Sequence, residues 1–176
     1  MTDFKAIFGK KIKFQTTDLT MSTATEGEVF YSDTNAKFKV GVVVEAWASG
    51  GALGTGRYRL GGAGTQTVGL TFGGSSSPGT VNYSVTEEYD GSSWTESGDL
   101  ATARRSIVGA GTQTAGLAFG GYDGALKNAT EEYGGASWTA GGNLGTARYR
   151  LMGAGTQTAG LAFGGNDGSN RGYTEE

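Results

Sequence analysis

A 13-residue string, GAGTQTAGLAFGG at residues 109–121, constrains this chain more than any other feature. It returns unchanged at 153–165 and, as GAGTQTVGLTFGG, at 62–74, so the starts lie 47 and 44 residues apart. A period of this length predicts one supersecondary unit per repeat, and such a unit buries its apolar face only against its neighbours. We therefore expect a row of similar small units.

Each repeat predicts four short strands. Residues 148–154 form the first, a turn at 155–158 follows, and residues 159–163 form the second strand. The third and fourth strands are represented, in the preceding repeat, by residues 130–133 and 137–140. Short strands at even spacing with Gly turns and recurring aromatic residues are typical of radial β repetition, and no segment shows a helical period of useful length.

The residues that repeat have structural explanations. The tryptophans are expected to fill the spaces between units, the double glycines to form turns or close contacts, and Phe72, Phe119 and Phe163 to lie in the core. Adjacent glutamates on a strand point to opposite faces, so Glu87-Glu88 and Glu131-Glu132 do not form catalytic pairs and are expected to pair with the repeated arginines. The repeated structural residues are Trp47, Trp94, Trp138, Gly73, Gly74, Gly120, Gly121, Gly164 and Gly165.

An apolar strand that ends in a double glycine, then Glu-Glu-Tyr-Asp, then Trp94, then Ala103-Arg104, resembles the kelch repeat. The resemblance covers residues 42–176 and implies four-stranded β-propeller blades, although Gly, Ala and Thr are unusually frequent. The expected fold is all-β: kelch-like blades of 44–47 residues, in units 42–88, 89–132 and an incomplete 133–176, preceded by a small N-terminal β element at 1–41.

Three periods are fewer than the four to eight blades of typical propellers. The sequence leaves three explanations open. The repeats continue in a longer chain, several copies close the structure together, or Val42 to Trp47 completes the unit that Thr174 to Glu176 begins. The first of these is preferred, because the repeat is cut in mid-strand.

Residues 1–41 differ in composition, because their positive charge comes only from Lys. Lys11 to Phe14 alternate as a half-exposed strand does, and residues 28–31 and 37–40 predict a hairpin around Ser32-Asp33-Thr34-Asn35. An isolated hairpin is marginal in water, so this element is expected to dock. It is either an edge appendage of the repeats or an attachment module for a partner or for copies of the chain.

The composition excludes several classes of function. The chain has neither Cys nor His, which removes thiol nucleophiles, Ser-His-Asp triads and the usual zinc or copper ligands. We therefore predict a protein that is not an enzyme and has no cofactor or metal; Asp-Gly at 123–124 and 167–168 lacks the further acids of a calcium loop. A net charge of −3 argues against nucleic-acid binding, and neither a secretory signal nor a membrane span is expected.

The repeats differ just after each double glycine, at 75–84, 122–128 and 166–173. Equivalent loops of a radial repeat emerge on one rim, where polar and Tyr side chains can bind and stack on a sugar. The same composition is ordinary for solvated loops. The candidate ligand- or receptor-binding residues are Asn82, Tyr83, Tyr122, Asp123, Lys127, Asn128, Asn166, Asp167, Asn170 and Arg171.

Near-identical Gly/Thr/Ala-rich repeats behind a short β module resemble phage tail-fibre and virion appendage proteins, and EGEVFYSDTNAKFKV at 26–40 is similar to their short β modules. The resemblance implies a homo-oligomeric virion protein, assembled in the host cytoplasm. Residues 1–41 would bind other virion proteins or copies of the chain, and the loops would bind a host-surface glycan or protein. The alternative is an intracellular kelch-type adaptor; the copper-oxidase activity of some kelch propellers lacks its ligands here.

Overall fold

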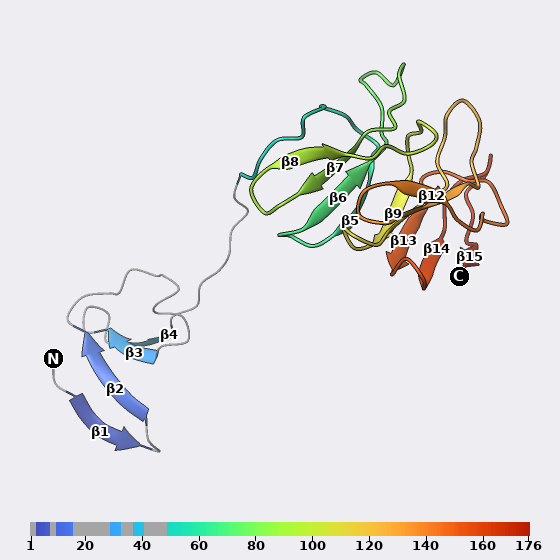
Figure 1. Cartoon of the computed structure of the whole chain (residues 1–176). Coiled ribbons are helices and arrows are strands. Elements are labelled where there is room, and N and C mark those ends of the chain that lie inside the picture. Colours follow the sequence, from blue (N-terminus) through green and yellow to red (C-terminus); the bar gives the residue numbers. More distant parts are fainter. Residues whose placement is uncertain (1–2, 8–9, 16–28, 33–36, 41–48) are drawn as a thin grey trace. The chain divides into compact units, whose positions relative to one another are not determined.

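The structure, a computed structural model, describes residues 3–7, 10–15, 29–32, 37–40 and 49–176 (Figure 1). The chain divides into two compact units, Met1–Ser49 and Gly50–Glu176, which are considered separately. All regular elements in the described residues are strands, as the all-β prediction requires. The expected domain boundary after residue 41, the expected strand Val42 to Trp47 and the expected turn at 33–36 lie outside these ranges.

The first unit contains one mixed sheet in the order β1-β2-β3-β4. The β3–β4 pair is antiparallel, with Tyr31 opposite Phe38, and confirms the expected hairpin. Strand β2 also pairs with β3, in parallel, which the sequence did not indicate. The strands are β1 (Asp3–Ile7), β2 (Lys10–Gln15), β3 (Val29–Ser32) and β4 (Lys37–Val40).

The second unit contains three antiparallel sheets whose strands pair in chain order. The first, sheet I, contains β5 (Gly61–Gly64), β6 (Gly69–Phe72), β7 (Thr86–Tyr89) and β8 (Trp94–Ser97). Sheet II contains β9 (Val108–Gly111), β10 (Gly116–Phe119), β11 (Thr130–Tyr133) and β12 (Trp138–Ala140). Sheet III contains β13 (Met152–Gly155), β14 (Gly160–Phe163) and β15 (Thr174–Glu175). Each four-stranded sheet therefore spans a boundary between the expected units.

The GTQT segments form the hairpin turns, and in the first of them the Thr65 amide donates to the Val68 carbonyl at 2.9 Å. The expected first strand, 148–154, is too long at its start. Strand β13 begins only at Met152, because Arg150 has φ 54° and the backbone there is not extended. The double glycines all have positive φ, between 65° and 108°, as the turn prediction requires.

Successive sheets pack closely through their first strands, β5, β9 and β13, which lie next to one another. Gly109 of β9 lies against the backbone of Gly62 and the ring of Phe72, where there is no room for a side chain. Gly153 of β13 is in the same situation against Phe119 and Val108. The first glycine of the repeated GAG, at Gly109 and Gly153, is therefore required by the contact between sheets.

We expect Gly109→Ala to destabilise the protein, because its Cβ would overlap the Gly62 carbonyl and lie 2.6 Å from Phe72 Cζ. Overpacking of this kind costs about 1–3 kcal/mol. Gly134→Ala is the matched control, since its Cβ meets nothing within 4 Å. Urea unfolding of both variants measures the difference, and equal midpoints would show that the sheets do not approach this closely.

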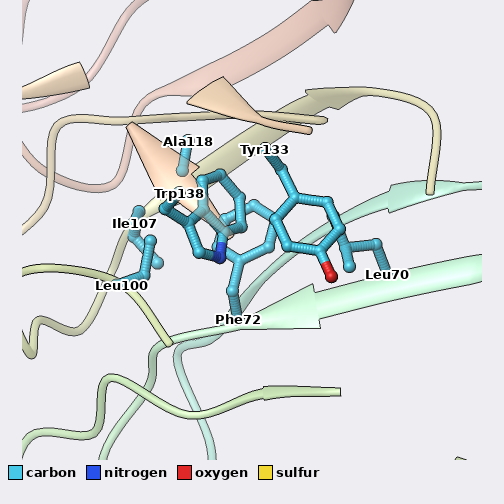
Figure 2. Packing of buried hydrophobic residues seen from close by; sticks show 7 residues of the cluster. All are labelled: Leu70, Phe72, Leu100, Ile107, Ala118, Tyr133 and Trp138. Atoms are coloured by element: carbon cyan, nitrogen blue, oxygen red, sulfur yellow. The ribbon is translucent and has the colours of Figure 1, made fainter. Parts of the chain in front are cut away.

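Aromatic residues fill the space between sheets I and II (Figure 2). Phe72 of sheet I packs edge-on against Trp138 of sheet II, with ring centroids 4.8 Å apart. The Trp138 indole also donates to Thr86 Oγ1 at 2.9 Å. Tyr133 is fully buried beside them, where desolvation and a hydrogen bond to Glu88 raise its pKa to about 12. Trp138 thus occupies the position between units that the repeat predicts.

The other members of the repeated sets do not have the same burial. Phe72 and Phe119 are buried, with 0% and 2% exposure, but Phe163 is 38% exposed. The expectation of a core position is wrong for Phe163, because within residues 49–176 no sheet follows sheet III. Trp94 is only partly buried and its ring packs on Tyr89, with centroids 4.9 Å apart; Trp47 lies outside the described residues.

The repeated arginines and glutamates form ion pairs, as the sequence predicts, and the arginine side chain is fully buried in each of them. Arg104 Nη1 lies 2.6 Å from Glu131 Oε1, and Arg148 Nη2 lies 2.9 Å from Glu175 Oε1. Arg57 pairs with Glu87 in the same way. The second oxygen of Glu131 accepts the Ala101 amide at 2.7 Å, and the equivalent oxygens of Glu87 and Glu175 accept the Gly54 and Gly145 amides. Each carboxylate therefore also fixes the segment that leads into its own sheet.

Candidate functional site

Three short segments, one before each sheet, approach one another in the second unit. Each contains a residue in the left-handed region: Arg59 (φ 58°), Ser106 (φ 52°) and Arg150 (φ 54°). Their backbones form a chain, because the Ser106 amide donates to Arg59 O at 2.7 Å and the Arg150 amide donates to Ser106 O at 3.3 Å. Residues other than Gly rarely adopt this conformation, and when they do the position is often functional.

The loops after the double glycines join these segments. The Arg105 amide donates to Tyr122 O at 3.0 Å, and the Tyr122 amide donates back to Arg105 O at 2.9 Å. Tyr149 and Asn166 exchange the same pair of hydrogen bonds, at 3.1 and 3.0 Å. The variable loops and the left-handed segments therefore form one continuous surface.

This surface contains a hollow of about 350 Å³. We call it the arginine–tyrosine hollow. Arg59 and Arg150 are exposed, Arg105 and both tyrosines are partly buried, and the lining includes no carboxylate. The lining residues are Arg59, Arg105, Ser106, Tyr122, Leu126, Tyr149, Arg150, Asn166 and Gly168.

Aromatic rings and one amide hold the arginines in place. The Arg105 guanidinium lies 4.8 Å from the centroid of the Tyr122 ring, and that of Arg150 lies 5.1 Å from the Tyr149 ring. Arg105 Nη1 also donates to Asn82 Oδ1 at 2.9 Å. Because cation–π contacts leave the guanidinium N–H groups available, these arginines can still donate to a ligand.

The chemistry of the hollow is that of an anion-binding site. Three guanidinium groups supply positive charge and paired N–H donors that match a carboxylate or phosphate. Tyr122 and Tyr149, whose ring centroids lie 6.0 Å apart, add hydroxyl groups and flat apolar faces. Such faces are suited to stacking against a sugar ring.

The structure brings three of the ten loop candidates into this site. Tyr122 and Asn166 line the hollow, and Asn82 contacts Arg105. Asn170 lies behind them, because its Oδ1 accepts from Asn166 Nδ2 at 3.0 Å.

The other candidates have local partners. Lys127 pairs with Asp123 at 2.8 Å and Arg171 with Asp167 at 2.8 Å, so each loop largely neutralises its own charge. The hydrogen bond from Lys127 lowers the pKa of Asp123, and that from Arg171 lowers the pKa of Asp167. Asn128 donates to the Leu144 carbonyl at 3.1 Å, and the Tyr83 amide donates to the Gly74 carbonyl at 2.9 Å, both of which are structural contacts.

Sequence reasoning missed Arg59, Arg105, Ser106, Tyr149 and Arg150. They lie one or two positions after the repeated arginine, and Tyr149 and Arg150 fall within the expected first strand at 148–154. The sequence does contain a pattern that indicates these residues. Arg57, Arg104 and Arg148 recur at the same place in every repeat, and the two residues that follow them are Tyr-Arg, Arg-Ser and Tyr-Arg in turn. Every repeat therefore has one additional Arg, at the first or the second of these two positions.

Comparison with known proteins supports only the fold. No protein-family model and no curated protein match the sequence. Among solved structures, the chain is similar to one described as the structure of YjhT, with 11% identity, a TM-score of 0.63, and coverage of 82% of this chain and 47% of that one. The chain thus spans about half the length of that protein.

Two features are absent from the residues that the structure describes. No helix among them is long and apolar enough to cross a membrane. No group of three or more His, Cys, Asp or Glu residues in this part of the chain is placed to hold a metal ion.

Proposed function

We propose that the chain is a non-enzymatic recognition protein that binds an acidic group of a host-surface glycan in the arginine–tyrosine hollow. The observation that carries the proposal is a concave lining with three arginines, two tyrosines and no carboxylate. A neutral sugar or an apolar peptide would leave three guanidinium groups without a counter-charge. A carboxylate or phosphate on a sugar uses both the charges and the ring faces.

The wider setting of the proposal is a virion appendage with kelch-like β-propeller blades. Three similar antiparallel sheets, packed side by side through their first strands, support the blade assignment. The resemblance of residues 26–40 and of the Gly/Thr/Ala-rich repeats to phage appendage proteins supports the virion assignment. In this setting residues 1–41 attach the chain to other virion proteins, and many copies raise the avidity of a weak single site.

We expect Arg150→Ala to weaken binding of an acidic sugar by about 10- to 100-fold, because a charge-assisted hydrogen bond contributes about 1.5–3 kcal/mol. Arg171→Ala is the matched control: it removes the same charge from the same repeat, but its partner is Asp167. Titration calorimetry with a carboxylated sugar and its neutral amide measures both effects.

Equal losses in the two variants would show that net charge, and not the hollow, attracts the ligand. Equal affinity of the wild-type chain for the acid and the amide would contradict the anionic ligand class. Binding of an acidic peptide but no sugar would favour the adaptor alternative.

A further inference from the structure

The three sheets of the second unit leave two different end faces. In the interface between sheets I and II, sheet I presents Phe72, Thr86 and the Gly69 carbonyl, and sheet II presents Trp138, Tyr133 and Gln113. In the interface between sheets II and III, sheet III presents the equivalent glutamine, Gln157. Sheet I has no sheet before it within residues 49–176, and sheet III has none after it. We call residues Gln66, Tyr89 and Trp94 of sheet I the tryptophan face, and residues Gly160, Phe163 and Thr174 of sheet III the phenylalanine face.

The internal interfaces show what these faces bind. Between sheets I and II, Gln113 Nε2 donates to Gly69 O at 3.0 Å and to Tyr89 O at 2.8 Å. Between sheets II and III, Gln157 Nε2 donates to Gly116 O at 3.0 Å and to Tyr133 O at 2.7 Å. The Phe72–Trp138 contact and the Trp138–Thr86 hydrogen bond complete the first interface. The glutamine contact is thus repeated with the sequence, whereas within residues 49–176 the tryptophan contacts are present only between sheets I and II.

Both end faces retain the residues for the Phe–Trp, Trp–Thr and Gln–Gly contacts but lack a partner sheet within the described part of the second unit. Phe163 is 38% exposed, and Met152 beside it on β13 is 62% exposed. On sheet I, a hollow of about 560 Å³ is lined by Leu53, Leu60, Gln66, Leu70, Tyr89 and Trp94. In sheet II the residues equivalent to Leu53, Leu60 and Trp94 are Leu100, Ile107 and Trp138, and all three are buried.

We infer that the tryptophan face of one copy binds the phenylalanine face of a second copy, head to tail. Phe163 of one copy then packs against Trp94 of the other, in the way that Phe72 packs against Trp138. The Trp94 indole donates to Thr174 Oγ1, as Trp138 donates to Thr86. Gln66 Nε2 donates to Gly160 O, as Gln113 donates to Gly69. No new type of contact is required.

The occupant is a copy of this chain because the faces are specific for this repeat. A head-to-tail contact forms either a ring or an open filament, depending on whether the rotation closes. Two copies supply six sheets, which lies within the range of about four to eight at which radial sheets close. The match covers 82% of this chain and 47% of the similar solved chain, so that chain is about twice as long as the part it shares with this one.

Light scattering and sedimentation of the full 176-residue chain test the inference. We expect a dimer, and we expect Trp94→Ala or Phe163→Glu to raise its dissociation constant at least about 30-fold, the effect of a buried aromatic anchor at an interface. Val81→Glu is the control, because Val81 is 51% exposed but lines neither face. Gln66→Ala is a milder variant at an exposed turn, so its effect on association is separable from misfolding, which circular dichroism reports.

Mixing the two face variants gives the sharpest result. Each variant alone damages both contacts of a closed pair, whereas a mixed pair has one intact contact and one doubly damaged contact. Energy transfer between differently labelled variants should therefore appear only in the mixture. A wild-type chain that stays monomeric up to its solubility limit would overturn the inference, and so would a dimer that persists in both variants. The latter result would locate self-association elsewhere, for example in residues 1–41, and would leave the anion-binding proposal unaffected.

Discussion

Glu131→Ala is expected to lower the free energy of unfolding by about 3–5 kcal/mol, the cost of leaving a buried charge without its partner. Arg104 has a side chain with 0% exposure, and its Nη1 lies 2.6 Å from the carboxylate. The variant also removes the acceptor of the Ala101 amide. The loss is large because water cannot reach the guanidinium once the carboxylate is gone.

Two further variants separate the effect of losing the buried charge from the effect of losing side-chain volume. Glu131→Gln keeps the volume and one acceptor oxygen, and should cost less than Glu131→Ala. Glu96→Ala removes an exposed glutamate of β8 and should change stability by about 0.5 kcal/mol or less. Urea unfolding provides the three free energies. If Glu131→Ala and Glu96→Ala differ by no more than their error, the repeated ion pair does not contribute as described.

Trp138→Ala is expected to cost about 3–5 kcal/mol, since it removes a large aromatic side chain from the space between two sheets. Its ring packs on Phe72 and Tyr133, with centroids 4.8 and 4.9 Å away, and its indole donates to Thr86. Both sheets lose contacts, so the unfolding transition should shift for the whole second unit.

Trp94→Ala is the control for this prediction, because Trp94 has the same place in the repeat and packs on Tyr89 of its own sheet but is less buried than Trp138. Measured at protein concentrations where the chain is monomeric, it should cost clearly less than Trp138→Ala. Thermal unfolding of both variants tests the comparison. Equal losses under those conditions would mean that the tryptophan face of sheet I is already covered within one chain.

Much of the second unit could be predicted from the repeated string. Period, strand number, glycine turns and the Arg–Glu pairs all follow from residues that recur at fixed offsets, such as Arg104 and Glu131. The contacts of a repeated unit can be predicted from its sequence, because every copy of the unit makes the same contacts. The position of Trp138 between sheets could be predicted for the same reason.

The exposure of Phe163 and the start of β13 could not be predicted in this way. Phe163 has the same place in the repeat as Phe72 and Phe119 but a different environment. Its burial depends on a neighbouring sheet and not on the residue itself. The left-handed backbone at Arg150 has no local sequence signal, since Arg does not favour positive φ. Tertiary contacts impose it, through the hydrogen bond between Arg150 N and Ser106 O.

The candidate site was predicted only in part for a related reason. Tyr122 and Asn166 lie in loops where the repeats differ, and this variation predicts them as binding residues. Arg59, Arg105 and Arg150 lie in segments where the repeats are similar, which indicates a structural role and not a binding role. Three arginines about 45 residues apart in the sequence meet only because the first strands of the three sheets lie side by side.

The most direct test of the central claim is a titration of the ¹⁵N-labelled chain with a carboxylated sugar, followed by amide NMR shifts. Saturable shifts are predicted at Arg59, Arg105, Tyr122 and Arg150, with none of comparable size at Asp123, Lys127 or the double glycines. The neutral amide of the same sugar should leave these signals in place. Saturable shifts confined to residues outside the arginine–tyrosine hollow, or the same shifts with the acid and its amide, would contradict the account.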